Sequence, residues 1–247
     1  MSAEIYIAEI KKLISKLENT QMEKIHQVAD LATEAFVNNN LVYVFGAGHS
    51  NILAIEVFAR AGGLFHMQAI FDKGLDLSAG ARRQGAFERL PGYVSCIIQD
   101  YDIGPGDVVI IASNSGRNPA PVQMALEAKR LGAVVVALTS LQHTNSVTSN
   151  DPSGKKLNEI ADIVIDNGCP AGDAVVELPN LPVRVGPSST VLGAMILDSI
   201  VTQTAKNLLE RGIVPPVAMS GNLPDGKEYN KQFANLREKF SKKLRHR

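Results

Sequence analysis

The chain has 247 residues, enough for one large α/β domain or two small ones. Its 25 basic and 25 acidic residues balance, which argues against nucleic acid or an anionic membrane as the main partner. Cys96 and Cys169 lack metal-ligand spacing, so we expect no metal, no cofactor and no disulfide framework. Residues 1–4 lack the basic start of a signal peptide, and no apolar run approaches the roughly 20 residues that span a bilayer. We therefore expect a soluble cytoplasmic protein.

Two amphipathic patterns precede the first predicted strand. Ile10 and Leu17 share one helical face with their neighbours in residues 4–18, and residues 21–37 repeat the pattern. We expect two helices within a helical arm formed by residues 1–40. Their apolar faces either pack on the sheet or contribute to a dimer interface, and the sequence leaves both alternatives open.

The first strand is predicted at Leu41–Phe45 and is followed by the glycine-rich loop Gly46-Ala47-Gly48-His49-Ser50. A helix is expected from Asn51 to Ala61, ending at Gly62-Gly63, and a second strand from Leu64 to Ile70. This is one complete strand–loop–helix unit.

Residues 71–92 are rich in Gly, Arg and Asp and show weak periodicity. A loop of this length inside a compact domain is usually functional or mobile. The alternative is an ordinary surface excursion with a helical turn at 83–90. Tyr93 to Gln99 then leads to a turn at Gly104–Asp107, directly before the central strand.

The central strand is predicted at Val108–Ala112, a short β-branched run that is typical of a strand buried on both faces. Residues Ser113–Asn118 form the loop after it, with Asn118 as N-cap and Pro119 as first residue of the next helix. Unpaired amides and the positive end of a helix dipole meet in such a loop, which favours an anion, most often phosphate.

Side chains within this loop strengthen the prediction of an anion site. Ser113 and Ser115 offer hydroxyl donors, and Gly116 allows close approach of the backbone. The loop carries neither the Walker pattern nor G-x-G-x-x-G, which argues against a conventional nucleotide loop.

Further elements continue the alternation of strands and helices. We expect strands at Ala133–Leu138 and Asp162–Ile165, a loop at 141–154, a short helix at Lys155–Ile160, a short apolar run at Ala174–Leu178, and a long helix from Ser188 to Arg211. Val214-Pro215-Pro216 stops that helix, and Glu228–Leu244 is predicted as a basic amphipathic helix with a solvated face.

The alternation from residue 41 to residue 211 predicts a parallel sheet with helices on both faces. Ligands in such folds bind outside the carboxyl ends of the strands. The loops at 46–50, 113–118 and 188–190 each precede a helix and carry Ser or Thr. We therefore expect the three loops to meet at one rim of the sheet and to form a phosphate site.

Three stretches resemble the sugar-isomerase (SIS) domain: GAGHS, IASNSGRNP with the later VVVALTS, and PSSTVLGAMILDSI. The resemblance covers about residues 30–211 and is closest to stand-alone SIS proteins that are compared with phosphoheptose isomerase. It implies a flavodoxin-like three-layer αβα sandwich with a five-stranded parallel sheet at 41–211. Residues 212–247 lie beyond the resemblance and are expected to form a C-terminal extension and helix. It also implies a phosphorylated sugar ligand and a homodimer or homotetramer with the site at a subunit interface.

The resemblance assigns ligand-binding roles by position. Ser113, Asn114, Ser115, Gly116 and Asn118 would bind the phosphate, and Gly48, Ser50, Ser188 and Ser189 would contact the sugar.

Aldose–ketose isomerisation needs a base that moves a proton between C1 and C2, and often a group that opens the ring. The candidates are Glu177, placed like the base of the isomerase domain of glucosamine-6-phosphate synthase, together with Glu56 and His49. Each has a simpler interpretation: a surface charge for Glu177, an i,i+4 pair with Arg60 for Glu56, and a ligand contact or loop hydrogen bond for His49. The position of the base in phosphoheptose isomerase corresponds here to Arg60, which weakens that analogy.

Three functions therefore stay open on the sequence. The first is a phosphosugar isomerase. The second is a non-catalytic phosphosugar sensor, which would need a partner to act in transcription because no helix-turn-helix is evident. The third is a lyase resembling N-acetylmuramic acid 6-phosphate etherase.

Overall fold

A five-stranded parallel sheet forms the centre of the computed structural model, which describes residues 2–236. The strand order is β2-β1-β3-β4-β5, the flavodoxin-like order expected from the resemblance. The strands are β1 (Val42–Gly46), β2 (Met67–Ile70), β3 (Val108–Ala112), β4 (Val134–Thr139) and β5 (Ile163–Asp166).

Successive side chains along each strand enter two separate hydrophobic clusters, because they point to opposite faces of the sheet. Val42 and Val44 of β1 belong to one cluster, and Tyr43 and Phe45 belong to the other. A sheet buried on both faces explains why the strands are read from the sequence as continuous apolar runs rather than as alternating ones.

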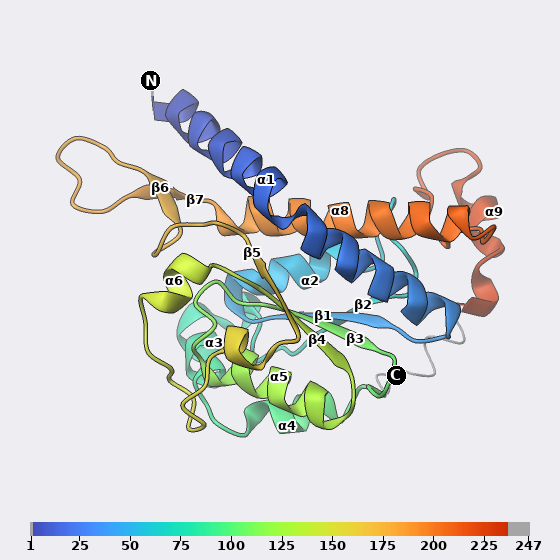
Figure 1. Cartoon of the computed structure of the whole chain (residues 1–247), viewed down its shortest axis with the longest axis horizontal. Helices are drawn as coiled ribbons and strands as arrows, with labels where there is room; N and C mark the ends of the chain where they lie inside the picture. Colours follow the sequence, from blue (N-terminus) through green and yellow to red (C-terminus); the bar gives the residue numbers. More distant parts are fainter. Residues whose placement is uncertain (1, 237–247) are drawn as a thin grey trace.

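Helices cover both faces of the sheet and form the outer layers (Figure 1). The first cluster packs against α1 (Ser2–Val37), α2 (Asn51–Val57) and α8 (Ser189–Glu210). The second packs against α4 (Tyr93–Ile98), α5 (Pro119–Arg130) and α7 (Leu157–Ile160). The three-layer αβα sandwich is therefore confirmed.

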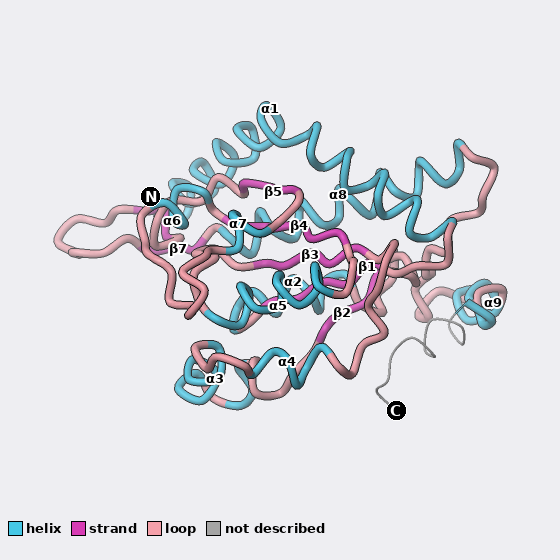
Figure 2. The backbone as a smooth tube through the Cα atoms, turned by 60° about the horizontal axis from the view of Figure 1, so that its bottom comes forward, coloured by secondary structure: helices cyan, strands magenta, loops and turns pink. Residues whose placement is uncertain are grey.

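Shorter elements lie around the carboxyl ends of the strands: η1 (Gly48–Ser50), η2 (Leu77–Ala79), α3 (Ala81–Glu88) and α6 (Leu141–Asn145). An antiparallel hairpin of β6 (Ala174–Val176) and β7 (Val185–Pro187) projects beyond the sheet, as Figures 1 and 2 show. The last described helix is α9 (Gly226–Lys231).

The expectation of two N-terminal helices is wrong, because α1 is one helix of 36 residues. No Gly or Pro interrupts the chain between the two amphipathic patterns. Asn19 and Thr20 instead donate side-chain hydrogen bonds to the carbonyls of Ser15 and Lys16, one turn earlier. The helix therefore continues through the residues that join the two amphipathic patterns.

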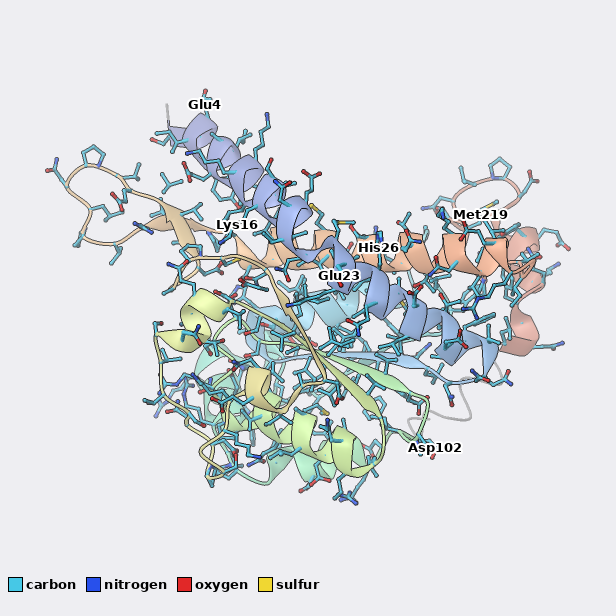
Figure 3. The ribbon with its side chains drawn as sticks, viewed as in Figure 1. Glu4, Lys16, Glu23, His26, Asp102 and Met219 are labelled. Atoms are coloured by element: carbon cyan, nitrogen blue, oxygen red, sulfur yellow. The ribbon has the colours of Figure 1, made fainter. Side chains whose placement is uncertain are left out.

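The two halves of α1 have different environments. Ile25, Val28 and Ala32 in the second half are buried in the same cluster as the sheet, which favours the alternative of packing on the sheet. Ile5 and Ile7 at the start of the helix are exposed. Figure 3 shows Glu4 at this end, which extends beyond the body of the protein. The Tyr6 hydroxyl donates to the carbonyl of Pro187 and ties this end to the projecting hairpin.

Several other boundaries differ from the prediction. Helix α2 ends at Val57 rather than Ala61, and Ala59 adopts a left-handed conformation with φ 49° that no helix continues through. Strand β2 begins at Met67, since Leu64 instead forms an isolated antiparallel bridge with Val217. Residues 71–92 contain η2 and α3, and 141–154 begins with α6.

The predicted helix Glu228–Leu244 lies partly outside the described residues. In its described part, α9 begins two residues earlier, at Gly226, and ends at Lys231, where a turn interrupts the helix. Among residues 2–236, no helix is both long enough and apolar enough to cross a bilayer.

Candidate ligand-binding cleft

A cleft of about 340 Å³ opens at the carboxyl ends of β1 and β3. These two strands flank the point where the strand order reverses, which is where open α/β sheets bind ligands. Its walls come from the loop after β1, from α3, from the loop after β3, from α6, and from the segment that leads into α8. The three loops that the sequence singled out thus meet at one place.

The loop after β3 is held in a tight turn by its own hydroxyl group. The Ser113 hydroxyl oxygen accepts a hydrogen bond of 3.2 Å from the Gly116 amide. Gly116 has φ +59°, and a Cβ there would lie 3.3 Å from Cβ of Leu157. A side chain at Gly116 would meet both backbone strain and Leu157, so glycine shapes this turn without lining the cleft itself.

Ser115 and Asn114 present donors to the cleft that have no protein acceptor. Among residues 2–236, neither the hydroxyl nor the amide of Ser115 donates a hydrogen bond to the protein. The side-chain Nδ2 of Asn114 is buried and likewise has no partner. These two residues therefore carry hydrogen-bonding capacity that the described part of the protein does not use.

A chain of hydrogen bonds fixes the orientation of the Asn114 amide. The backbone amide of Cys169 donates to Oδ1 of Asn167. Nδ2 of Asn167 must then donate to Oδ1 of Asn114, at 2.9 Å. Because Oδ1 of Asn114 is the acceptor in this pair, its Nδ2 is the group left without a partner in the cleft wall.

The loop after β1 contributes Gly48, His49 and Ser50 to the cleft. A Cβ on Gly46 would lie 2.2 Å from the carbonyl oxygen of Ser50, so only glycine allows the chain to fold back at this point. This fold brings Ser50 to the wall, where it also lines a smaller adjoining pocket with Ser113 and Ser189. His49 is exposed to solvent at the rim.

The N-terminus of α8 is filled by a side chain of the protein. The Asp173 carboxylate accepts four hydrogen bonds, two from the amides of Ser188 and Ser189 and two from their hydroxyls. Ser188 is fully buried and does not line the cleft, whereas Ser189 does. The expectation that this third loop offers free anion donors is therefore wrong, because an internal carboxylate already binds them.

Glu88 is a carboxylate in the cleft that the sequence analysis did not single out. Its Oε1 accepts a hydrogen bond of 2.7 Å from Asn118, and its Oε2 accepts one of 2.9 Å from Gln84. The only sequence signal was the helical turn expected at 83–90, which here is part of α3. That signal says nothing about which residue of the turn faces the loop after β3.

Asn118 begins α5 as predicted, but its side chain makes no capping hydrogen bond. Its amide group instead donates to Glu88 and accepts from Asn150, and the residue is almost fully buried. Asn118 does not line the cleft. In this structure it positions Glu88 rather than presenting its side chain to a phosphate.

His143 also lines the cleft, from α6. Its Nδ1 is buried without a hydrogen-bond partner among the described residues. Burial lowers the pKa of His143, and the nearby Arg117 lowers it too, against the opposite effect of Asp173. At neutral pH this imidazole is therefore uncharged and can exchange a proton with a ligand.

Glu56 and Glu177 lie outside the cleft. Glu56 on α2 forms an ion pair with Arg60, four residues later and beyond the end of the helix, so the predicted pair forms although Arg60 is not helical. Glu177 is exposed on the projecting hairpin and pairs with Arg184 across it, at 2.6 Å. Within one chain, the structure brings neither carboxylate to the residues of the loop after β3.

The cleft has a distinctive charge pattern. No Lys or Arg side chain is among its lining residues within the described part of the chain, whereas the carboxyl groups of Glu88 and Asp173 are. Over the same residues, no group of three or more His, Cys, Asp or Glu side chains is arranged to hold a metal ion. The other polar groups of the described lining are hydroxyls, amides and the imidazoles of His49 and His143.

Structural similarity supports the fold. A phosphoheptose isomerase from Francisella tularensis aligns with a TM-score of 0.57 and 16% identity, covering 83% of this chain and 96% of that chain. A phosphoheptose isomerase from Neisseria gonorrhoeae aligns with a TM-score of 0.54 and 17% identity, covering 83% and 95%.

Sequence similarity extends over the whole length. A UPF0309 protein of Caldanaerobacter subterraneus subsp. tengcongensis is 44% identical over 246 residues, covering 98% of this chain and 99% of that protein. A UPF0309 protein of Geobacillus kaustophilus is 38% identical over 239 residues, covering 97% and 94%. The family model of the SIS domain matches residues 5–140. The chain therefore belongs to the SIS domain family and is similar over its full length to the UPF0309 proteins.

Proposed function

We propose that this protein binds a phosphorylated sugar in the cleft, with the phosphate at the loop after β3. The observation that carries the proposal is the gathering of donors without protein acceptors, from Asn114 and Ser115, beside the N-terminus of α5. A helix N-terminus of this kind stabilises a dianion without a cationic side chain. Ser50 and Ser189 would contact sugar hydroxyls.

Similar proteins support the same class of ligand. Two of the solved structures with this fold, from Francisella tularensis and Neisseria gonorrhoeae, are described as phosphoheptose isomerases. At 16% and 17% identity their likeness is one of fold, so the lining of the cleft carries the argument for the ligand. Phosphate and polyol recognition through charge-assisted and hydroxyl hydrogen bonds agrees with that lining.

We further propose aldose–ketose isomerisation as the reaction. Glu88 is the candidate base, since its carboxylate faces the cleft and is held by Asn118 and Gln84. It would remove the proton from C2 and return it to C1. His143, uncharged at neutral pH, and His49 at the rim are the candidates for opening the ring. Proton transfer by such a group is worth about 10²- to 10⁴-fold in rate.

Glu88→Gln tests the base. With a panel of hexose, heptose and amino-sugar phosphates, we expect the variant to lose interconversion by about 10²-fold or more, while phosphosugar still raises the melting temperature. Glu127→Gln removes the same charge from the exposed pair of Glu127 with Arg130 and should not change the rate.

Other results would select another function. Stabilisation of the wild-type protein without turnover on any sugar would favour a sensor, and release of lactate from a lactyl ether would favour an etherase. A loss confined to Glu56→Gln or Glu177→Gln would move the base to one of those residues and contradict the role of Glu88.

A further inference from the structure

The N-terminus of α8 has the features of an anion site, yet the protein supplies the anion itself. This helix is 22 residues long, and its first amides and hydroxyls converge on Asp173. The distances from the Asp173 oxygens to these donors are 2.6–3.1 Å. Such short charge-assisted hydrogen bonds hold a carboxylate firmly.

Asp173 also forms part of the cleft wall, next to Gly172 and Ser189. Its negative charge therefore faces the same space as the loop after β3. Glu88 adds a second carboxylate to the lining, and no lysine or arginine among the described lining residues balances them. In the loop after β3, by contrast, the donors of Ser115 and Asn114 have no carboxylate bound to them among the described residues.

We propose that Asp173 is a specificity-determining residue that admits sugar monophosphates and rejects ligands with a second anionic group. The inference rests on the proposed function, because it takes the phosphate to bind at the loop after β3. A second phosphate or a carboxylate on the ligand would meet donors that Asp173 already occupies, and would be repelled by its charge. Placing like charges together in a binding site is strongly unfavourable.

The inference narrows the substrate class. It favours a sugar whose remaining substituents are hydroxyl or amino groups, and disfavours sugar bisphosphates and sugar acid phosphates. A substrate that carries a lactyl carboxylate belongs to the rejected group, so the inference also bears on the etherase alternative.

Asp173→Asn is a suitable test because it removes the charge and keeps the structure. Asp173 has φ +70°, a left-handed conformation that asparagine tolerates well. The asparagine oxygen can still accept from the amides of Ser188 and Ser189, and its NH₂ group can donate to the Ser189 hydroxyl. Glu210→Gln removes one charge from the exposed far end of the same helix and serves as the control.

The experiment compares dissociation constants for two matched pairs, fructose 6-phosphate with fructose 1,6-bisphosphate and glucose 6-phosphate with glucose 1,6-bisphosphate, by titration calorimetry on the full-length protein. We expect the wild-type protein and Glu210→Gln to prefer the monophosphates by about tenfold or more. In Asp173→Asn the preference should fall to about threefold or less, through tighter bisphosphate binding.

Two results would overturn the inference and are distinguishable. If Asp173→Asn binds monophosphates and keeps the wild-type preference for them over bisphosphates, Asp173 does not determine specificity. The proposed function is then unaffected. Failure of wild-type protein to bind any phosphosugar of the panel would overturn the proposed function and, with it, this inference. Circular dichroism melting checks that Asp173→Asn is folded.

Discussion

The N-termini of α5 and α8 lie at the same cleft and are built from similar residues. They differ in whether nearby donors have a protein acceptor. At α5, the serine-rich loop keeps the donors of Ser115 and Asn114 without protein acceptors. At α8, Ser188 and Ser189 donate to the Asp173 carboxylate. The comparison teaches that serine residues at a helix N-terminus keep donors for an anion only where no carboxylate of the chain accepts from them.

Ser115→Asp should have the largest effect, because it places a carboxylate at the N-terminus of α5, as Asp173 does at the N-terminus of α8. We expect phosphosugar binding to weaken by about 100-fold or more through like-charge repulsion, with little effect on folding. The measurement is the phosphosugar-dependent rise in melting temperature. Ser15→Asp adds the same charge to the exposed surface of α1 and should leave that rise intact. A ligand-dependent rise that persists in Ser115→Asp would mean that the phosphate binds elsewhere.

Acidic pH should lower the free energy of unfolding through His66, which belongs to neither helix N-terminus. His66 is fully buried next to Phe36, directly before β2, and burial lowers the pKa of His66 to about 4. The unfolded chain takes up a proton near pH 6.5 and the folded chain does so only near pH 4. The free energy of unfolding therefore keeps its full value above about pH 6.5. It falls by about 3 kcal/mol as the pH drops to about 4.

Urea unfolding between about pH 7 and about pH 4 checks this prediction. His66→Leu should reduce the pH dependence, whereas His26→Leu, which changes an exposed histidine on α1 (Figure 3), should retain it. An unchanged pH dependence in His66→Leu would place the titrating group elsewhere. The two helix ends are best compared above about pH 6.5, where this effect is absent.

Two substitutions that shorten a side chain, one at each helix N-terminus, should have the smallest effects on the free energy of unfolding. Asp173→Gly keeps the left-handed backbone and removes the cap of α8, so we expect a loss of about 1 kcal/mol in the free energy of unfolding. Ser115→Ala removes a hydroxyl that has no protein partner among the described residues, so its effect should stay within about 0.5 kcal/mol. Urea unfolding without ligand measures both. Equal losses would mean that the two helix ends are equally engaged by the protein.

Local sequence signals predicted the elements that form the central part of the site. Val108–Ala112 and the start of α5 at Pro119 agree with the structure, because a β-branched run and an Asn-Pro boundary act within a few residues. The division of residues 4–37 into two helices was wrong, since Asn19 and Thr20, between the two amphipathic patterns, bond to carbonyls of the preceding turn and the helix continues. Such polar residues occur in either context, so the pattern alone could not decide.

The sequence by itself determined the parallel sheet, the helices on both faces and the serine-rich loop after β3, because strand and helix periodicity and turn residues are written into neighbouring positions. Only the tertiary structure decided which carboxylates face that loop. Glu88 and Asp173 lie far from Ser115 along the chain and reach the cleft through α3 and the segment before α8. Hydrogen bonds that join distant segments, such as those of Asp173 with Ser189 and of Glu88 with Asn118, leave no periodic trace in the sequence.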